Sequence, residues 1–171
     1  MRGNIILYTG DGGGKTAAAL GLALRSLGHG HKVVMIQFMK GRKDIGEYLI
    51  KERLSPEFEV YQAGREEFVN LEKPDEIDRK LAEKGLEFCR EVLKRKPDLL
   101  ILDEMNIAVA AGLLNLDEVL ALLKEIPEGM VVVLTGRYAP KELMEKADYV
   151  VEINDLKRPA EEIPPRKGIE Y

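Results

Sequence analysis

The segment of residues 5–16 constrains the fold more than any other part of the chain, because it joins an apolar run to a glycine-rich loop. The run Ile5–Thr9 is typical of a buried strand, and residues 15–27 are rich in alanine and leucine, as in a buried helix. Between them lies the sequence Gly10-Asp11-Gly12-Gly13-Gly14-Lys15-Thr16. Glycines let the backbone wrap around an anion, and the N–H groups of the loop and helix start supply a positive field. The order strand, loop, helix therefore predicts a phosphate-binding loop.

The side chains of this loop suit a nucleoside triphosphate with a divalent metal. Lys15 offers a point charge to phosphate oxygens, and the Thr16 hydroxyl is placed to bind Mg²⁺ or Mn²⁺. The standard loop has four residues between its first glycine and Gly-Lys, whereas Gly10 leaves three, so this loop is a short variant. We expect ATP to be bound by residues of the loop and of the helix start: Gly10, Asp11, Gly12, Gly13, Gly14, Lys15, Thr16 and Ala17. The alternative is a glycine-rich turn with an exposed lysine.

Short apolar runs alternate with helical patterns along the rest of the chain. Strands are expected at 5–9, 33–38, 58–61, 99–103, 130–135 and 149–153, and helices at 15–27, 75–96, 116–124 and 140–146. Most of the runs are continuously apolar, as in strands covered on both faces. We predict an α/β, three-layer P-loop NTPase (RecA-like) fold with a mostly parallel sheet of about six strands. One domain over residues 1–171 is expected, with 154–171 as a C-terminal tail.

Composition excludes several other classes of protein. The formal charge of -4 argues against a broad basic face, so no nucleic-acid partner is expected. No run approaches the roughly 20 apolar residues of a membrane span, so no membrane association is expected. The single cysteine, Cys89, cannot form an internal disulfide, which suits a reducing compartment. We expect a cytoplasmic protein.

The run of residues 99–103 ends in two carboxylates, Asp103 and Glu104. An acidic group near a phosphate loop holds the metal, directly or through water, so Thr16, Asp103 and Glu104 form the predicted metal set. Glu104 could instead polarise a nucleophile. An ordinary acidic turn after a strand is the alternative.

The run of residues 130–135 leads into Thr135-Gly136-Arg137. An arginine at the carboxyl end of a strand can bind phosphate bidentately and stabilise departing charge, although a surface arginine in a tight turn would look the same. Ligands of such sheets lie beyond the carboxyl ends of the strands, where these groups meet. The predicted catalytic residues are therefore Lys15, Glu104 and Arg137, and Arg137 also joins the ATP contacts.

Two further segments carry polar residues that either line the site or are merely solvated. Lys40 and Glu47 follow the second predicted strand and could line the site, but a solvated loop explains them equally well. The tail carries basic residues that could close over a triphosphate, or remain in solvent: Lys157, Arg158, Arg166 and Lys167.

Taken together, these motifs resemble the P-loop family of ATP:corrinoid adenosyltransferases of cobalamin synthesis and salvage. The family's loop is also one residue short, and its second strand ends in Gln-Phe-x-Lys-Gly followed by Gly-Glu. The matching residues are Gln37, Phe38, Lys40, Gly41, Gly46 and Glu47. Further matches are Leu102-Asp103-Glu104, Thr135-Gly136-Arg137, Ala147-Asp148 and the ending Gly168-Ile169-Glu170-Tyr171. The chain departs from the family pattern at Ala17, usually a second threonine, and in residues 64–68, where Phe68 is the one aromatic.

The resemblance implies transfer of the 5′-deoxyadenosyl group of ATP to the reduced cobalt of a corrinoid, with release of triphosphate. It also implies that ATP is held in reverse relative to ordinary P-loop enzymes, with its 5′-carbon facing the corrin. The implied partners are the corrinoid, a reductase that donates electrons and a second copy of the chain in a homodimer. Candidate corrinoid contacts are Phe38, Met39, Lys40, Glu47 and Phe68.

Two other functions remain compatible with the residues. A RecA-like small-molecule kinase or ATPase would use the same loop and carboxylates but attack the γ-phosphate. A nucleotide-binding regulator would bind ATP without turnover, which would suit Ala17 and the sparse aromatic segment.

Overall fold

The computed structural model describes residues 3–159 and 163–171, so part of the predicted tail, residues 160–162, lies outside the described residues. The described chain contains one sheet of six strands in the order β3-β2-β4-β5-β1-β6. Every neighbouring pair of strands is parallel. The strands are β1 (Asn4–Thr9), β2 (Val33–Phe38), β3 (Phe58–Ala63), β4 (Leu99–Asp103), β5 (Val131–Thr135) and β6 (Tyr149–Glu152).

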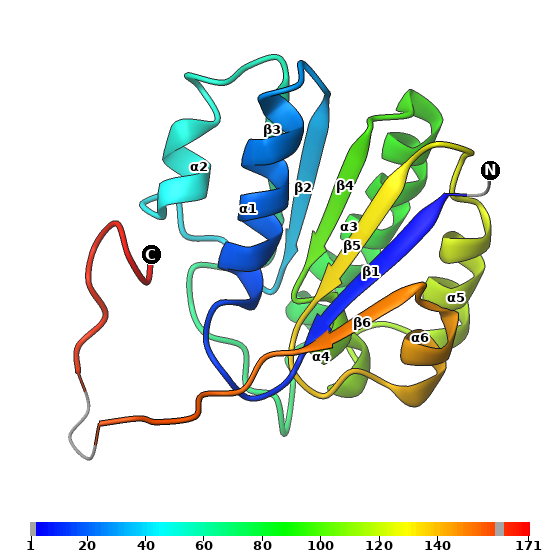
Figure 1. Cartoon of the computed structure of the whole chain (residues 1–171). Coiled ribbons are helices and arrows are strands. Elements are labelled where there is room, and N and C mark those ends of the chain that lie inside the picture. The colour runs from blue at the N-terminus through cyan, green and yellow to red at the C-terminus, as the bar shows by residue number, and fades with distance from the viewer. Residues whose placement is uncertain (1–2, 160–162) are drawn as a thin grey trace.

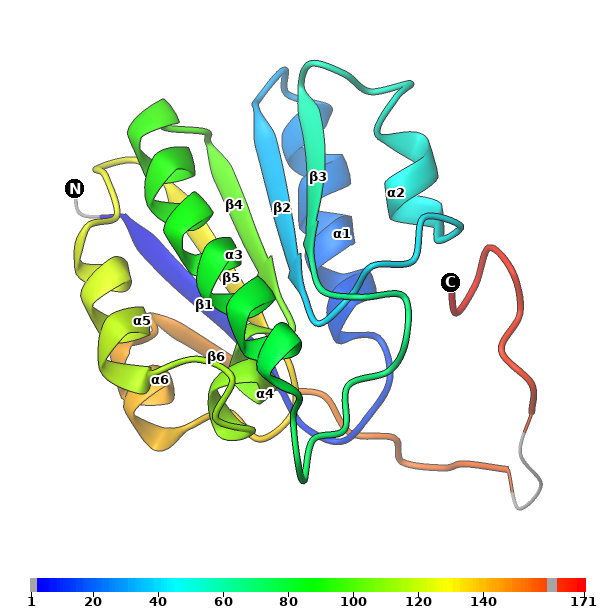
Figure 2. The same ribbon diagram turned by 180° about the vertical axis from the view of Figure 1, so that it is seen from behind.

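Helices cover both faces of this sheet, as Figures 1 and 2 show from opposite sides. One face carries α1 (Lys15–Leu27) and α2 (Gly46–Ile50). The other face carries α3 (Glu76–Arg95), α4 (Met105–Ala110), α5 (Leu116–Lys124) and α6 (Lys141–Lys146). The predicted three-layer α/β fold with a parallel sheet is therefore confirmed.

Strand β2 shows why the apolar runs are continuous. Its residues Val33 and Met35 pack in the same cluster as α1, whereas Val34, Ile36 and Phe38 pack in the cluster that contains α3. All six of its residues are buried. Because successive side chains point to opposite faces and both faces are covered, the strand is apolar on both faces except at Gln37, near its carboxyl end.

Two short helices were not predicted from the sequence. Helix α2 has five residues and α4 has six, and each begins shortly after a strand ends. Segments of this length are too short to display a helical period. The strand and helix boundaries elsewhere fall within two residues of those predicted.

The sheet order places four loops side by side. Strands β2, β4, β5 and β1 are consecutive neighbours, and because they are parallel, their carboxyl ends all lie at one edge. This is the lower edge of the sheet in Figure 1, where the loop between β1 and α1 turns. The segments that follow these four strands are therefore brought together at that edge.

The close packing of α3 on the sheet predicts opposite effects for two helical glycines. A Cβ atom on Gly85 in α3 would lie 2.6 Å from the Cβ of Ala63 and 2.9 Å from Cε1 of Phe38, whereas one on Gly21 in α1 would meet nothing within 4 Å. We expect Gly21→Ala to raise the free energy of unfolding by about 0.5–1 kcal/mol through helix propensity. Gly85→Ala should lower it by about 1–3 kcal/mol through overpacking.

Urea denaturation of the two variants beside the parent measures both changes. A stabilised Gly85→Ala variant would show that α3 can move away from the sheet without cost.

Candidate functional site

The phosphate loop has the backbone shape that its glycines predict. Gly10 and Gly14 have φ angles of 98° and 97°, which side chains rarely adopt. A Cβ atom on Gly10 would also lie 2.4 Å from the carbonyl oxygen of Ile153. Gly14 is the N-cap residue of α1, so the helix begins at Lys15 with its free N–H groups directed at the loop.

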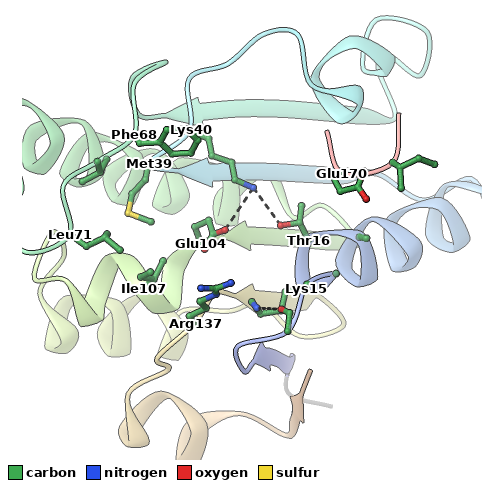
Figure 3. A pocket seen from close by; sticks show the side chains of 16 residues that line it. Lys15, Thr16, Met39, Lys40, Phe68, Leu71, Glu104, Ile107, Arg137 and Glu170 are labelled. Atoms are coloured by element: carbon green, nitrogen blue, oxygen red, sulfur yellow. Dashed lines mark hydrogen bonds and ion pairs between the residues drawn. The ribbon is translucent and has the colours of Figure 1, made fainter. Parts of the chain in front are cut away.

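Lys15 is buried within this loop. Its Nζ donates hydrogen bonds to the carbonyl oxygens of Gly10 (2.7 Å) and Gly12 (2.6 Å). Burial lowers the pKa of Lys15, and the nearby charge of Arg137 lowers it further. The side chains of Lys15, at the start of α1, and Arg137, in the turn after β5, lie beside each other in the pocket, so two cations face the same space (Figure 3).

Asp103, at the end of β4, is the centre of the site. Its carboxylate is fully buried and accepts hydrogen bonds from four side chains. Oδ1 accepts from the hydroxyls of Thr16 (2.8 Å) and Thr135 (2.7 Å), and Oδ2 accepts from Lys40 (2.6 Å) and Gln37 (3.4 Å). Burial acts to raise the pKa of Asp103, but the Lys40 charge and these hydrogen bonds outweigh it and lower the pKa. Asp103 is therefore a firmly ionised anchor.

Glu104 has a different environment from its neighbour. It has a positive φ of 60°, precedes α4, and its backbone N–H donates to the Thr135 hydroxyl at 3.0 Å. Its side chain is 28% exposed, and Oε1 lies 4.0 Å from Nζ of Lys40. Burial and the Asp103 charge raise the pKa of Glu104, against the opposing effect of the nearby cations. Glu104 thus presents a less stabilised carboxylate to the pocket (Figure 3).

The predicted metal set consists of oxygen donors, the ligands that Mg²⁺ and Mn²⁺ prefer. Thr16 and Asp103 are in direct contact, and the Glu104 carboxylate faces the same cavity. Among the described residues, no cluster of three or more His, Cys, Asp or Glu side chains is placed to hold a metal. The donors present therefore fit an ion that takes its remaining ligands from phosphate and water, as Mg²⁺ commonly does.

Asn106, which the sequence reasoning missed, fixes the turn that carries Arg137. This buried side chain donates from Nδ2 to the carbonyl oxygens of Tyr8 (2.9 Å) and Gly136 (3.0 Å). It therefore ties β1 to the turn after β5. Gln37 and Thr135 belong to sequence motifs that assign them no role, and their contacts with Asp103 give each a structural role.

Two adjoining cavities of about 660 and 530 Å³ lie over the loop. The first is lined by the loop residues 12–17 together with Glu104, Arg137 and an apolar wall of Met39, Phe68, Val69, Leu71 and Ile107. Residues shared by both are Thr16, Ala17, Met39, Lys40, Phe68, Ile169 and Glu170. The site therefore combines a charged floor with an apolar wall and continues into a second chamber.

The candidate corrinoid contacts divide into two groups. Met39, Lys40 and Phe68 line both cavities, and Glu47 lines the second, where its Oε1 accepts a hydrogen bond from Gln37 at 2.8 Å. Phe38 does not belong with them, because its side chain is fully buried in the core that contains α3. Strand alternation directs the Phe38 side chain to the face of the sheet covered by α3, and the chain turns at Met39, whose φ is 58°. The expectation for Phe38 is thus corrected.

The segment after β6 returns to the phosphate loop. The carbonyl of Ile153 accepts from the Gly12 N–H (2.8 Å), and Oδ1 of Asp155 accepts from the Gly13 N–H (3.2 Å). Arg158 donates to the Asp11 carbonyl at 3.0 Å, whereas Arg166 pairs with Glu170 within the tail. Among the described basic residues of the tail, Arg158 is therefore in contact with the backbone of the phosphate loop.

A parallel sheet with this glycine loop and an acidic strand end defines a P-loop nucleotide-binding protein. The solved structure of the flagellar accessory protein FlaH from Methanocaldococcus jannaschii has a similar fold, with a TM-score of 0.58 at 16% identity over 88% of this chain and 71% of that one. A KaiC-like protein from Pyrococcus horikoshii gives a TM-score of 0.55 at 16% identity over the same shares. These two likenesses support the RecA-like P-loop fold and nothing beyond it.

Sequence relatives specify the family within this class. The family "ATP:corrinoid adenosyltransferase BtuR/CobO/CobP" matches residues 1–171, and the chain belongs to it. The corrinoid adenosyltransferase of Escherichia coli strain K12 is 37% identical over 91% of this chain and 79% of its own length. That of Pseudomonas aeruginosa is 37% identical over 99% of this chain and 84% of its own length. The protein is therefore a transferase. None of the helices in the described part of the chain is long and apolar enough to cross a membrane.

Because the two neighbouring carboxylates differ in environment, removing the charge of each should have opposite effects on the free energy of unfolding of the ligand-free protein. Asp103→Asn should lower the free energy of unfolding by about 2 kcal/mol, because it leaves the partly exposed Lys40 without its partner. Glu104→Gln should raise it by about 0.5–1 kcal/mol, because it removes a carboxylate that burial and Asp103 disfavour.

The two carboxylates also make the free energy of unfolding depend on pH in opposite directions. Asp103, with its lowered pKa, stabilises the fold above its unfolded pKa of about 3.9, and this is lost as pH falls through the folded pKa. Glu104, with its raised pKa, makes the fold more stable as pH falls through its folded value. Denaturation at neutral and mildly acidic pH measures the Glu104 effect, and denaturation below a pH of about 3.9 measures the Asp103 effect. An equal loss in the two variants would contradict the assignment.

Proposed function

We propose that the protein transfers the 5′-deoxyadenosyl group of ATP to the reduced cobalt of a corrinoid and releases inorganic triphosphate. The observation that carries this proposal is the lining of the two cavities. The described lining contains the phosphate loop, Arg137 and an apolar wall, but no serine, cysteine or histidine. This lining supports a nucleophile that comes from a substrate, and reduced cobalt is one.

The cysteine and the two histidines of the chain lie elsewhere. Cys89 is buried in α3, where burial raises the pKa of its thiol to about 12, so it carries no thiolate at neutral pH. His29 and His31 lie between α1 and β2, at the amino end of β2 and so at the opposite edge of the sheet. Neither group is available to the cavities over the phosphate loop.

The charged floor suits the leaving group. In the proposed reaction an electron pair of cobalt forms the cobalt–carbon bond at C5′, while the C5′–oxygen bond breaks and its electrons leave with triphosphate. Lys15, Arg137 and the loop N–H groups would stabilise that charge, and the rigid loop would hold C5′ in line with cobalt. Thr16 and Glu104, backed by Asp103, would hold a divalent ion, which when bound neutralises phosphate charge.

The apolar wall suits the other substrate. Met39, Phe68, Leu71 and Ile107 line the side of the cavity that faces Lys15 and Arg137 (Figure 3). A reversed ATP would present its 5′-carbon to a corrin ring packed on this wall. The relatives named corrinoid adenosyltransferases support this choice of substrate. We further propose a reductase as the electron source, a homodimer as the assembly and the cytoplasm as the location.

The products of the reaction test this proposal directly. Incubation with ATP, Mg²⁺ and chemically reduced cobalamin should produce the spectrum of a cobalt–carbon bond and one triphosphate per adenosyl group. Lys15→Ala should slow the reaction by about 100-fold or more, because it removes a cation from the leaving group. Lys124→Ala, in the last turn of α5, is the matched control and should leave the rate unchanged. ADP in place of triphosphate would indicate phosphoryl transfer, and tight ATP binding without product would indicate a regulator.

The exposed ring of Phe68 gives a second, more specific test. Phe68 is 94% exposed, so truncation should cost the fold little, yet it lines both cavities. If the Phe68 ring contacts the corrin or excludes its lower axial ligand, Phe68→Ala should slow the reduction of Co(II), because axial ligation tunes the reduction potential of the cobalt. ATP binding, measured by calorimetry, should survive. Leu24→Ala, an exposed apolar residue on α1 outside the cavities, is the control, and equal loss of both properties in Phe68→Ala would contradict the assignment.

A further inference from the structure

We propose that Lys40 is an internal counter-cation that occupies the metal position and so weakens the binding of free divalent ions. A metal that arrives bound to a nucleotide displaces the Lys40 ammonium from this position. The position is defined by the oxygen atoms of Thr16, Asp103 and Glu104. This inference rests on the proposed nucleotide site, but it concerns which form of the metal binds there rather than which reaction the site performs.

The geometry that carries the inference is the place of the Lys40 ammonium. Its Nζ lies 2.6 Å from Oδ2 of Asp103, 3.4 Å from Oγ1 of Thr16 and 4.0 Å from Oε1 of Glu104. Figure 3 shows the ammonium reaching toward Thr16 and Glu104 from the loop after β2. One positive charge therefore faces all three oxygen-bearing side chains of the predicted metal set.

A divalent ion cannot join this arrangement unless Lys40 moves. Mg²⁺ binds oxygen at about 2.0–2.1 Å, so an ion on these oxygens would need the space that Nζ fills. An ammonium and a divalent ion within a few ångströms of each other also repel strongly in a partly buried site. Lys40 and the metal are therefore mutually exclusive ligands of the same carboxylates.

The surroundings give Lys40 another partner to move to. Its side chain is 30% exposed and lines both cavities, so the ammonium can swing away from Asp103 without crossing the core. Glu47 lines the second cavity and attracts Lys40 electrostatically. Gln37 donates to Glu47 at 2.8 Å and to Asp103 at 3.4 Å, and so keeps the two carboxylates adjacent.

The exchange has a functional consequence. Without phosphate, the ammonium neutralises the carboxylates and a free divalent ion gains little by replacing it. When the metal enters with a triphosphate, the phosphate oxygens complete its coordination and their charge offsets the displaced ammonium. The site is thereby selective for the metal–nucleotide complex over the free metal.

Binding of Mn²⁺ to the purified protein tests this, with electron paramagnetic resonance of the free ion as the readout. No ATP and no corrinoid are present. Lys40→Met keeps most of the length of the side chain but removes its charge, and we expect it to bind Mn²⁺ at least about ten-fold more tightly than the parent. Lys40→Arg, which keeps the charge, should bind as weakly as the parent. Lys43→Met is the matched control on the same loop and should not change the affinity.

Two outcomes would overturn the proposal. One is a folded Lys40→Met variant, verified by circular dichroism, whose Mn²⁺ affinity equals or falls below that of the parent. The other is tight binding by Lys40→Arg, which would show that charge is not the reason. If Lys40→Met does not fold, Lys40→Gln replaces it under the same expectation. Neither substrate is in the assay, so the Mn²⁺ result does not depend on whether the protein catalyses adenosyl transfer. Equally, a negative Mn²⁺ result would not contradict adenosyl transfer.

Discussion

The buried carboxylate of Asp103 is the interaction on which the site depends. A fully buried charge is tolerated only when it is paired and hydrogen-bonded, and Asp103 has both kinds of partner. Its donors come from the start of α1, from β2 and its following loop, and from β5. These are the strands that flank β4 and the helix that follows β1, so one side chain fixes the relative positions of the segments that form the floor of the cavity.

The two adjacent carboxylates have different tasks because the backbone changes direction between them. Asp103 is the last residue of β4 and points into a ring of donors, whereas Glu104 has a positive φ and opens into the cavity. Lys40 lowers the pKa of both carboxylates, yet burial and the charge of Asp103 leave the pKa of Glu104 raised. A fixed anion beside a less satisfied one provides an anchor for the loop and a free ligand for an incoming cation.

The sequence was sufficient for the sheet, the phosphate loop and the convergence of Lys15, Glu104 and Arg137, because these follow from strand–helix alternation and from parallel strands ending at one edge. It could not place Phe38, since β2 is apolar on both faces and its pattern does not say which face leads to the ligand. Asn106 and the contact of Asp155 with Gly13 were also missed. These hydrogen bonds join residues that are far apart in the chain, so no local sequence pattern predicts them.

The location of the cavities suits the reaction at carbon that we propose for this nucleotide-binding fold. In the described part of the chain, the cationic groups Lys15 and Arg137 lie on one side of the first cavity and the apolar side chains Met39 and Phe68 on the other (Figure 3). The proposed reaction has a polyanion that leaves and a macrocycle whose cobalt attacks, and an in-line displacement needs these two groups on opposite sides of the reacting carbon. The end of the tail belongs to this arrangement, because Ile169 and Glu170 line both cavities. The phosphate loop supplies the anion floor, and the segments after β2, β3 and β4 supply the apolar wall, so the two halves of the proposed site come from different segments of the chain.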